Sequence, residues 1–387
     1  MDGNKRIGRY IKSSVVGGEY YNSYIPPSLP PEPKINMEKF YFLLDKANIA
    51  LGRLDGISQI LPDSSLFLYM YVRKEAILSS QIEGTQSSLS DLLLFENEQA
   101  FNSRVDDVTE VSSYVSAMNY GLQRIKEFPL SLRLIKEIHA VLMNNSRGAN
   151  KQAGEFRTSQ NWIGGSRPSN ARFVPPPPDY LMECLDNLEK FLHDEDVKLP
   201  VLVKAALAHV QFETIHPFLD GNGRLGRLLI TFILCVEGVL KEPLLYLSLY
   251  LKTNRSTYYA HLQSVRETGD WEGWIKFFLE GVIQTAGQAS DTAQIIISLF
   301  AKDAEKIAGS NKSTNAIVEI HSYLQRNPIS NTSKIKEKTG FSLHTVIRSL
   351  TVLEALGIVQ ETTGKERHKV FVYKEYLDIL SAGTEPF

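Results

Sequence analysis

Residues 216–227 of this 387-residue chain read HPFLDGNGRLGR, a stretch that combines one histidine, one carboxylate, three glycines and two arginines. Two of the glycines flank Asn222 just before helical periodicity begins. Glycines allow consecutive backbone N–H groups to point inward at the positive end of the following helix, which makes an anion cradle. Arg224 and Arg227 are three residues apart at the start of that helix, so both side chains can reach the same anion.

The same stretch supplies a base and a metal ligand. His216 opens the loop, where a neutral imidazole can take a proton from an attacking hydroxyl. Asp220 cannot bind an anion directly, and beside a phosphate cradle its carboxylate is typical of a magnesium ligand. A base, a metal ligand, an anion cradle and two cations together indicate phosphoryl or nucleotidyl transfer.

A dinucleotide-binding loop is the competing interpretation, because GNGRLG also matches the pattern G-x-G-x-x-G. That fingerprint must follow a buried β-strand. Residues 201–215, VLVKAALAHVQFETI, instead repeat Ala, Leu and Val at helical spacing, so we expect helix–loop–helix. A Walker A phosphate loop is excluded as well, since no Gly-Lys-Ser/Thr follows the glycines.

Helical periodicity dominates the region that must position this loop, from residue 36 to about residue 308. Residues 1–36 are extended in character and too rich in proline for a helix. Residues 155–178 interrupt the helices with β-type residues on either side of a Gly-Gly and then a proline run, which predicts a β-hairpin flap. Small polar residues at 308–313 predict a linker.

Beyond the linker, three short helices are followed by two strands around a polar tip, the order of a winged helix-turn-helix. Residues 311–387 carry ten Lys or Arg and eight Asp or Glu, a net charge of +2. The expected recognition helix offers only His344 and Arg348 as cations. DNA binding therefore stays open, and a protein-interaction or dimerisation role is the favoured alternative.

The composition is that of a folded soluble protein, with 43% hydrophobic and 22% charged residues. A net charge of −2 gives no general attraction to nucleic acid or to anionic membranes. The longest apolar run, residues 228–240, is too short to span a bilayer and includes Glu237. The first ten residues lack the apolar stretch of a signal peptide, so we expect a cytoplasmic protein without membrane contact.

The catalytic stretch resembles the signature of the Fic domain, H-x-F-x-[DE]-G-N-G-R-x-x-R, and matches it at every specified position. GEFRTSQNWIGG…ARFVPPPP is similar to the family's target-binding flap, and LSLYLKTNRSTYY to the segment that closes its nucleotide pocket. The resemblance covers about residues 21–307, and some members carry a winged helix as an appendage. It implies a mainly α fold, with a helical Fic core, a β-hairpin flap and a small winged helix-turn-helix domain.

The resemblance implies transfer of AMP from ATP to a Ser, Thr or Tyr hydroxyl of a target protein, or of the chain itself, with release of pyrophosphate. ATP is then the substrate, His216 the catalytic base, and Mg²⁺ the cofactor on Asp220, which is the residue type of the AMP-transferring branch. The implied ATP- and phosphate-binding residues are Glu83, Gly221, Asn222, Gly223, Arg224, Leu225, Gly226, Arg227 and Asn254. The implied target-binding flap residues are Asn161, Trp162, Ile163, Gly164 and Gly165.

A second short motif, SSQIEG at residues 79–84, fits the family's inhibitory pattern [ST]-x-x-x-E-[GN] and precedes the catalytic loop. The resemblance implies that Glu83, on an inhibitory helix N-terminal to the core, pairs with Arg227 and restrains the enzyme. We therefore expect an extended segment and helices including this motif over residues 1–105. The Fic catalytic core and following helices would span 106–307, and the winged-helix domain 308–387.

Two other functions stay open at this point. The same site can be used in reverse, as a de-AMPylase in which Glu83 positions the water that removes AMP. A different class of protein is a transcription regulator whose winged helix binds DNA while the Fic core only senses nucleotide. The intact catalytic motif argues against a purely sensory core. The identity of the protein substrate and the formation of a homodimer are not fixed by the sequence.

Overall fold

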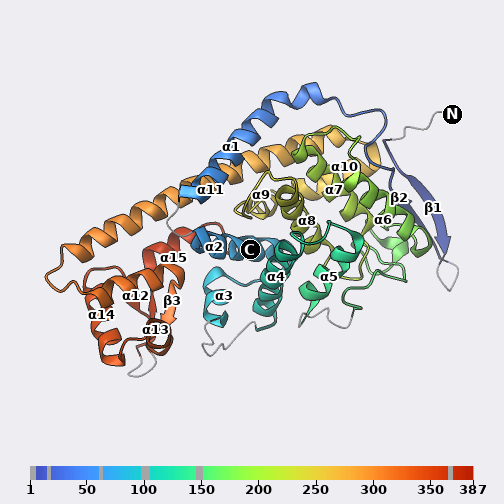
Figure 1. Ribbon diagram of the computed structural model, residues 1–387. Helices are drawn as coiled ribbons and strands as arrows, with labels where there is room; N and C mark the ends of the chain where they lie inside the picture. The colour runs from blue at the N-terminus through green and yellow to red at the C-terminus, as the bar shows by residue number, and fades with distance from the viewer. Residues whose placement is uncertain are drawn as a thin grey trace.

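The computed structural model describes residues 6–14, 19–60, 64–96, 105–144, 151–364 and 369–386 (Figure 1). The helices before the catalytic loop are α1 (Tyr41–Ile60), α2 (Ser64–Ile82), α3 (Leu89–Glu96), α4 (Val105–Arg124), α5 (Leu132–Met143), α6 (Pro178–His193) and α7 (Val201–Ile215). Those after it are α8 (Asn222–Val236), α9 (Ser248–Thr253), α10 (Arg255–Thr268), α11 (Trp271–Ala308), α12 (Asn315–Arg326), α13 (Thr332–Thr339), α14 (Leu343–Ala355) and α15 (Lys374–Ser381). The strands are β1 (Arg9–Ser14), β2 (Tyr20–Ile25), β3 (Ile329–Asn331), β4 (Gln360–Glu361) and β5 (Val370–Val372). The mainly α fold expected from the sequence is confirmed.

Helices α7 and α8 form the centre of the catalytic region. The α7 helix is apolar around most of its circumference and is buried along nearly its whole length, packed against α6, α8, α10 and α11. The α8 helix follows after the short loop 216–221, so the expected helix–loop–helix is present. Both helices anchor the loop in the core, which leaves its conformation little freedom.

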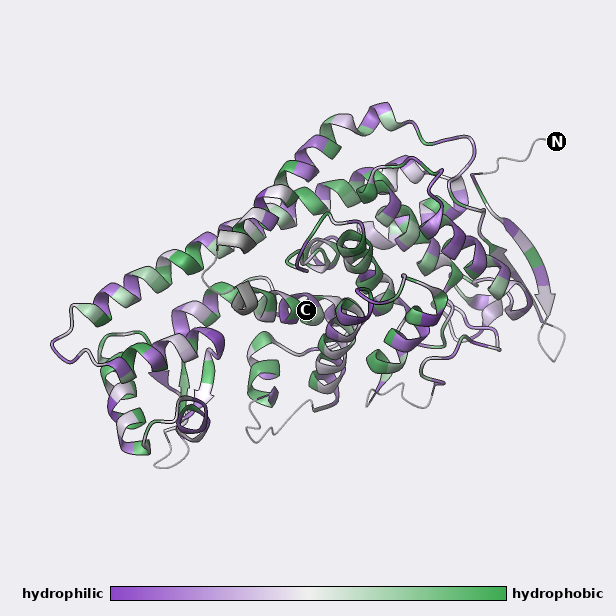
Figure 2. Ribbon diagram, in the orientation of Figure 1, coloured by the Kyte–Doolittle hydropathy of each residue, from purple (hydrophilic) through white to green (hydrophobic). Residues whose placement is uncertain are grey.

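Helices α2 and α11 pack against this pair, α2 against α8 and α11 against α7. The α2 helix packs against α4 and α9 and also contacts α8. The long helices α1 and α11 lie side by side at the edge of the molecule (Figure 1). Hydrophilic and hydrophobic residues alternate along both of them in Figure 2, as expected of helices with one face in solvent. In the described part of the chain, no helix is long and apolar enough to cross a membrane.

The N-terminal segment, expected only to be extended, forms a β-hairpin. Strands β1 and β2 pair in antiparallel register over their whole length. The backbone N–H of Tyr24 donates to the carbonyl of Val174 at 2.9 Å. This bond ties the hairpin to the end of the flap.

The hairpin predicted for the flap is present in a reduced form. Ile163 and Phe173 exchange two backbone hydrogen bonds, at 2.8 and 3.1 Å, and make an isolated β-bridge. Gly164 and Gly165 turn the chain with φ values of +70° and +75°, and a short 3-10 turn at Pro168–Asn170 follows. The prolines at residues 175–178 have no N–H to donate, so the pairing cannot extend into longer strands.

The C-terminal region has the predicted order of helices and strands, with β3 as an addition. Helices α12, α13 and α14 pack together, and the strands form an antiparallel sheet in the order β3-β5-β4. The α15 helix then leaves this unit and packs against α2, α3 and α11. The winged-helix class and the three region boundaries stay predictions, and the last helix shows that the C-terminal region contacts the helical core.

Candidate active site

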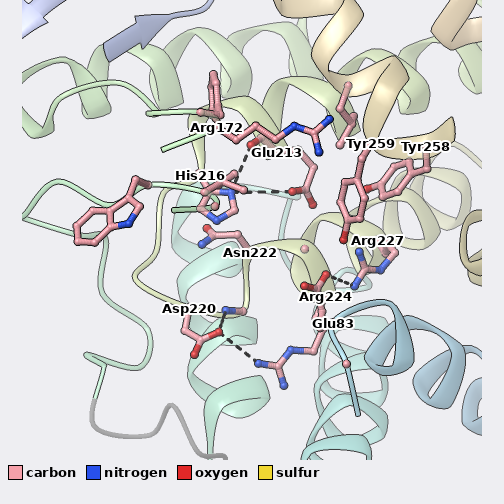
Figure 3. Close-up of a pocket in the computed structure, with 18 of the residues that line it drawn as sticks. Glu83, Arg172, Glu213, His216, Asp220, Asn222, Arg224, Arg227, Tyr258 and Tyr259 are labelled. Atoms are coloured by element: carbon pink, nitrogen blue, oxygen red, sulfur yellow. Dashed lines mark hydrogen bonds and ion pairs between the residues drawn. The ribbon is translucent and has the colours of Figure 1, made fainter. Parts of the chain in front are cut away.

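The loop 216–221 opens into a cavity of about 730 Å³, lined by residues of the flap, of the turn that follows α2, and of helices α4, α7, α8 and α10 (Figure 3). Backbone in the left-handed region marks both ends of the loop, with φ of +50° at His216 and +76° at Gly221. A Cβ at residue 221 would lie 2.8 Å from Met143 Sδ and 3.3 Å from His139 Nε2. Glycine is therefore required there for both conformation and space.

His216 is held by its neighbours in a form suited to accept a proton. Its backbone carbonyl accepts hydrogen bonds from Arg157 Nε (2.9 Å) and Asn161 Nδ2 (3.2 Å). The ring Nδ1 lies 3.3 Å from the carbonyl oxygen of Glu213, so the Nδ1–H tautomer donates there and Nε2 is left to accept. Burial lowers the pKa of His216 to about 4, which keeps the imidazole neutral at neutral pH.

Asn222 and His139 fix the middle of the loop. The amide of Asn222 bonds the backbone of Phe218 twice, accepting its N–H (2.9 Å) and donating to its carbonyl (2.8 Å). The Phe218 ring stacks on His139, with ring centroids 3.7 Å apart. Because Gly154 N–H donates to His139 Nδ1, Nε2 carries the ring proton and donates to the carbonyl of Asp220 (3.0 Å). Asn222 lines the cavity, but its side chain serves the loop itself.

Arg227 is buried in the first turns of α8 and binds the end of α2. Its Nε donates to Ser79 Oγ (2.8 Å) and its Nη2 to Ser79 O (2.9 Å). Nη2 also donates to Glu83 Oε1 (2.7 Å), as Figure 3 shows. Glu83 and Arg227 thus form the ion pair that the resemblance implies. A Cβ at residue 223 would lie 2.2 Å from Glu83 Oε1. The Glu83 carboxylate can therefore occupy this position only because residue 223 is glycine.

The carboxylate of Glu83 is ionised within this pair. Burial alone acts to raise the pKa of Glu83, but the charge and hydrogen bond of Arg227 outweigh it and lower that pKa below its ordinary value. The Glu83 side chain is still 38% exposed, and it faces the cavity. A fixed negative charge therefore lies in a cavity whose lining also includes five arginines, namely Arg172, Arg224, Arg227, Arg255 and Arg266.

The second arginine, Arg224, lies between two carboxylates. Its Nη1 is 3.4 Å from Glu110 Oε2, and its Nη2 is 3.7 Å from Asp220 Oδ1. Asp220 also accepts the N–H of Gly221 (2.6 Å) and pairs with Lys151 Nζ (2.9 Å). Burial opposes ionisation of Asp220, but the bonds from Lys151 and Gly221 lower its pKa below the ordinary value.

The metal-binding expectation rests on Asp220. Among the residues that the structure describes, no group of three or more His, Cys, Asp and Glu side chains could hold a metal ion by itself. A magnesium ion on a nucleotide needs only one or two protein carboxylates, because phosphates and water supply its other ligands. The ionised carboxylate of Asp220, 35% exposed at the cavity, fits that smaller requirement.

Some residues expected to bind the nucleotide lie elsewhere. Leu225 is buried, and Gly226 packs against Phe212 and Glu213. Asn254 caps α10 and donates from Nδ2 to the carbonyl of Tyr250 (3.0 Å). The residues of its segment that line the cavity are Arg255, Tyr258 and Tyr259. Asn254 thus lies outside the lining of the cavity, although its neighbours in the sequence contribute to it.

The expected flap residues divide between two roles. Trp162, Ile163 and Gly164 line the cavity. Asn161 instead donates from its amide to the carbonyls of His216 and Phe218, so it supports the catalytic loop. Gly165 lies at the tip, where a Cβ would be 2.5 Å from the carbonyl of Asn170. The N–H and carbonyl of Ile163 are bonded within the flap, which removes them from any edge offered to a target.

Sequence reasoning missed Glu213 and two buried arginines. Glu213 Oε2 lies 4.0 Å from His216 Nδ1, and burial raises the pKa of this carboxyl to about 7. Arg157 binds the His216 carbonyl, and Arg266 lines the cavity and donates to the carbonyl of Glu213. The spacing of Glu213 three residues before His216 was a usable signal. The arginines come from distant segments that only the fold brings together.

Comparison with known families agrees with this geometry. Residues 41–123 match the Fic/DOC family N-terminal model, and residues 129–234 match the Fic/DOC family model. These segments of the chain thus carry the Fic N-terminal and Fic domains.

Named relatives and solved structures extend the comparison. The chain is 29% identical over 232 residues to protein adenylyltransferase Fic of Drosophila erecta, covering 58% of this chain and 44% of the relative. It is 31% identical over 173 residues to protein adenylyltransferase fic-1 of Caenorhabditis elegans, covering 44% and 31%. It thus spans less than half of these curated relatives. A Fic family protein from Desulfovibrio desulfuricans G20 shares the fold, with a TM-score of 0.56, 18% identity, and coverage of 86% of this chain and 96% of that one.

Proposed function

We propose that the chain is a protein adenylyltransferase, which transfers AMP from ATP to a Ser, Thr or Tyr hydroxyl of a target protein or of itself. The observation that carries the proposal is one cavity that holds a neutral His216, the N-terminus of α8, and two arginines of that helix. The relatives named protein adenylyltransferase support it. A neutral base beside an anion cradle suits nucleotidyl transfer.

In the proposed reaction, Nε2 of His216 accepts the proton of the target hydroxyl while the hydroxyl oxygen forms a bond to the α-phosphorus of ATP. The bond from the α-phosphorus to the oxygen that bridges to the β-phosphate breaks, and pyrophosphate leaves. The first N–H groups of α8 have no partner within the helix, so they and Arg224 stabilise the charge on the phosphates. Glu213, 4.0 Å from Nδ1, faces the imidazolium that results.

Magnesium belongs to the proposal through Asp220. When bound, the ion neutralises charge on the ATP phosphates. The Asp220 carboxylate would hold it at the rim of the cavity, in place of the present ion pair with Lys151. Gly221 N–H and the carbonyl contact from His139 would keep Asp220 oriented.

Glu83 enters the proposal as an inhibitory residue. Its carboxylate uses the Arg227 guanidinium that would otherwise meet the phosphates. It also places a negative charge in the space that the ATP phosphates need. The conformation seen in this structure is therefore proposed to be autoinhibited, and AMP transfer requires Glu83 to move away from Arg227.

The two cysteines bear on the location of the protein. Cys184 and Cys235 are both free thiols, which is typical of a reducing compartment, and we propose a cytoplasmic enzyme. The protein substrate is defined only by its hydroxyl. DNA contact would depend on the exposed His344 and Arg348 of α14, and neither DNA binding nor a homodimer forms part of the proposal.

Radioactive ATP labelled at different phosphates distinguishes AMP transfer from phosphoryl transfer. The Glu83→Gly variant should become labelled from ATP that carries ³²P on the α-phosphate and not from ATP labelled on the γ-phosphate, which leaves with pyrophosphate. Mass spectrometry should then find AMP on a hydroxyl side chain. Labelling from the γ-position would indicate phosphoryl transfer instead, and labelling from neither position would contradict the proposed function.

A further inference from the structure

The segment 382–386, which follows α15, lies on the catalytic core beside α2 (Figure 1). Side chains of α2 and α9 donate hydrogen bonds to its backbone carbonyls. The bonds run from Lys74 Nζ to Ala382 O (2.8 Å), from Gln81 Nε2 to Thr384 O (2.9 Å), and from Lys252 Nζ to the carbonyls of Gly383 (3.4 Å) and Glu385. The segment is thus bound through its backbone along most of its length.

The surface that binds the segment is buried and shaped for it. Lys74, Gln81 and Lys252 are all buried, and burial lowers the pKa of Lys74 to about 8. A buried ammonium requires polar partners in place of water, and the carbonyl of the segment is one. Gly383 has a φ of +83°, and a Cβ there would lie 2.9 Å from Leu249 Cδ1. The site therefore accepts a peptide with glycine at this position.

Gln81 connects this surface to the inhibitory motif, because it lies within SSQIEG. Ser79 and Glu83 project from the opposite side of α2 and bind Arg227. The helix ends at once, with Glu83 N–H bonded to Ser80 O and with Gly84 at a φ of +105°. The last turn of α2 is therefore held by Arg227 on one side and by the segment on the other.

The turn is buried in the core through Ile82, and Gln81 Nε2 also donates to Ser87 O (2.9 Å), but several of its polar groups lack partners. Among the described residues, four buried side-chain atoms around it have no hydrogen-bond partner, namely Ser80 Oγ, Gln81 Oε1, Thr85 Oγ1 and Ser87 Oγ. Buried polar atoms without partners destabilise the arrangement that contains them. The bond from Gln81 Nε2 to Thr384 O adds a contact from outside the turn to this conformation.

We propose that the surface formed by Lys74, Gln81 and Lys252 is a docking site for the chain's own segment 382–386, and that its occupancy holds Glu83 against Arg227. The enzymatic consequence rests on the proposed function. A ligand of the C-terminal region that withdraws the segment would release the inhibitory turn and raise AMP transfer. The C-terminal region would then act as a sensor linked to the active site.

Hydrogen exchange tests the docking without reference to activity. Gly383→Val should expel the segment, since valine meets Leu249 and resists a positive φ. Amide exchange in residues 79–88 should become about 10-fold faster or more, while exchange in α7 and α8 stays slow. Gly357→Val is the matched control, because Gly357 has a φ of +71° with open space around it. A synthetic peptide of residues 380–387 should restore slow exchange to a chain that ends at Ser381.

The outcomes separate this proposal from the proposed function. Unchanged exchange at residues 79–88 in both Gly383→Val and the shortened chain would overturn the docking, whatever the activity. Faster exchange should be accompanied by AMP transfer approaching that of Glu83→Gly, and combining Gly383→Val with Glu83→Gly should add nothing. Faster exchange with wild-type AMP transfer, while Glu83→Gly is active, would show that the segment does not hold Glu83. An inactive Glu83→Gly contradicts the proposed function and leaves the exchange result standing.

Discussion

His216→Ala should lower the rate of AMP transfer by about 10²–10⁴-fold, the usual effect of removing a general base. The reason is that Nε2 is the ring nitrogen left to accept the target's proton once Nδ1–H donates to Glu213 O. The loss should fall on kcat, because in the proposed function α8 holds the phosphates and the imidazole does not. The rate is measured with α-labelled ATP in the Glu83→Gly background, and ATP affinity by calorimetry.

A second histidine provides the control for that experiment. His193, at the end of α6, is exposed at the surface, and its ring also bonds a backbone carbonyl, with Nε2 3.0 Å from Leu130 O. His193→Ala removes a comparable contact and should keep the parent rate. Retention of the parent rate by His216→Ala would remove the histidine from the chemistry, whereas loss of ATP binding would show that it shapes the cavity.

The part of the site that the sequence could predict is the part encoded locally. Glycine at 221 and 223, the arginines on α8 and the histidine before them all follow from one short stretch, and their geometry is set by a single loop between two buried helices. The helical fold was predictable for the same reason, since apolar periodicity is a local signal. The ion pair of Glu83 with Arg227 needed the family resemblance, because nothing local links two residues so far apart.

What the sequence could not give depends on packing between distant segments. Arg157 and Asn161 of the flap donate hydrogen bonds to the His216 carbonyl. Lys151, which precedes the flap in the sequence, forms an ion pair with Asp220. The use of Asn161 as a support also differs from its expected role at a target-binding edge. Polar residues in loops have many potential partners, so only the assembled fold selects among them.

The pairing of β1 with β2 escaped prediction for a related reason. Their residues, RYIKSS and YYNSYI, lack a continuous apolar face, and the β1 residues are mostly exposed. Pairing of such strands depends on tertiary contacts more than on local sequence. Here β2 is held by the hydrogen bond from Tyr24 N–H to Val174 O. The sequence therefore indicated extended backbone but not a hairpin.

Glu83→Gly should raise AMP transfer by about 10²-fold. A small misplacement of reacting groups can slow a reaction by about this factor, and the substitution should correct such a misplacement. In the present structure the carboxylate both occupies Arg227 and lies against Gly223, where the phosphates would approach the start of α8. Its removal frees the guanidinium and the space together. Self-modification with α-labelled ATP is a convenient measurement. Glu96→Gln is the matched control, since it breaks another ion pair of α2, with Arg73 (2.8 Å), outside the cavity.

The double variant Glu83→Gly with Arg227→Ala decides whether the freed arginine is the cause. If Glu83 restrains the enzyme by occupying Arg227, removing the guanidinium should cancel the gain, and the two changes will not be additive. If Glu83 acts only by filling space or by its negative charge, the double variant should stay as active as Glu83→Gly. Ser79→Ala separates a third contribution, because Ser79 Oγ and O hold the same guanidinium in place at 2.8 and 2.9 Å. With Glu83 absent, Ser79→Ala loosens Arg227 without removing it, so a fall in kcat there would show that Arg227 must be oriented as well as free.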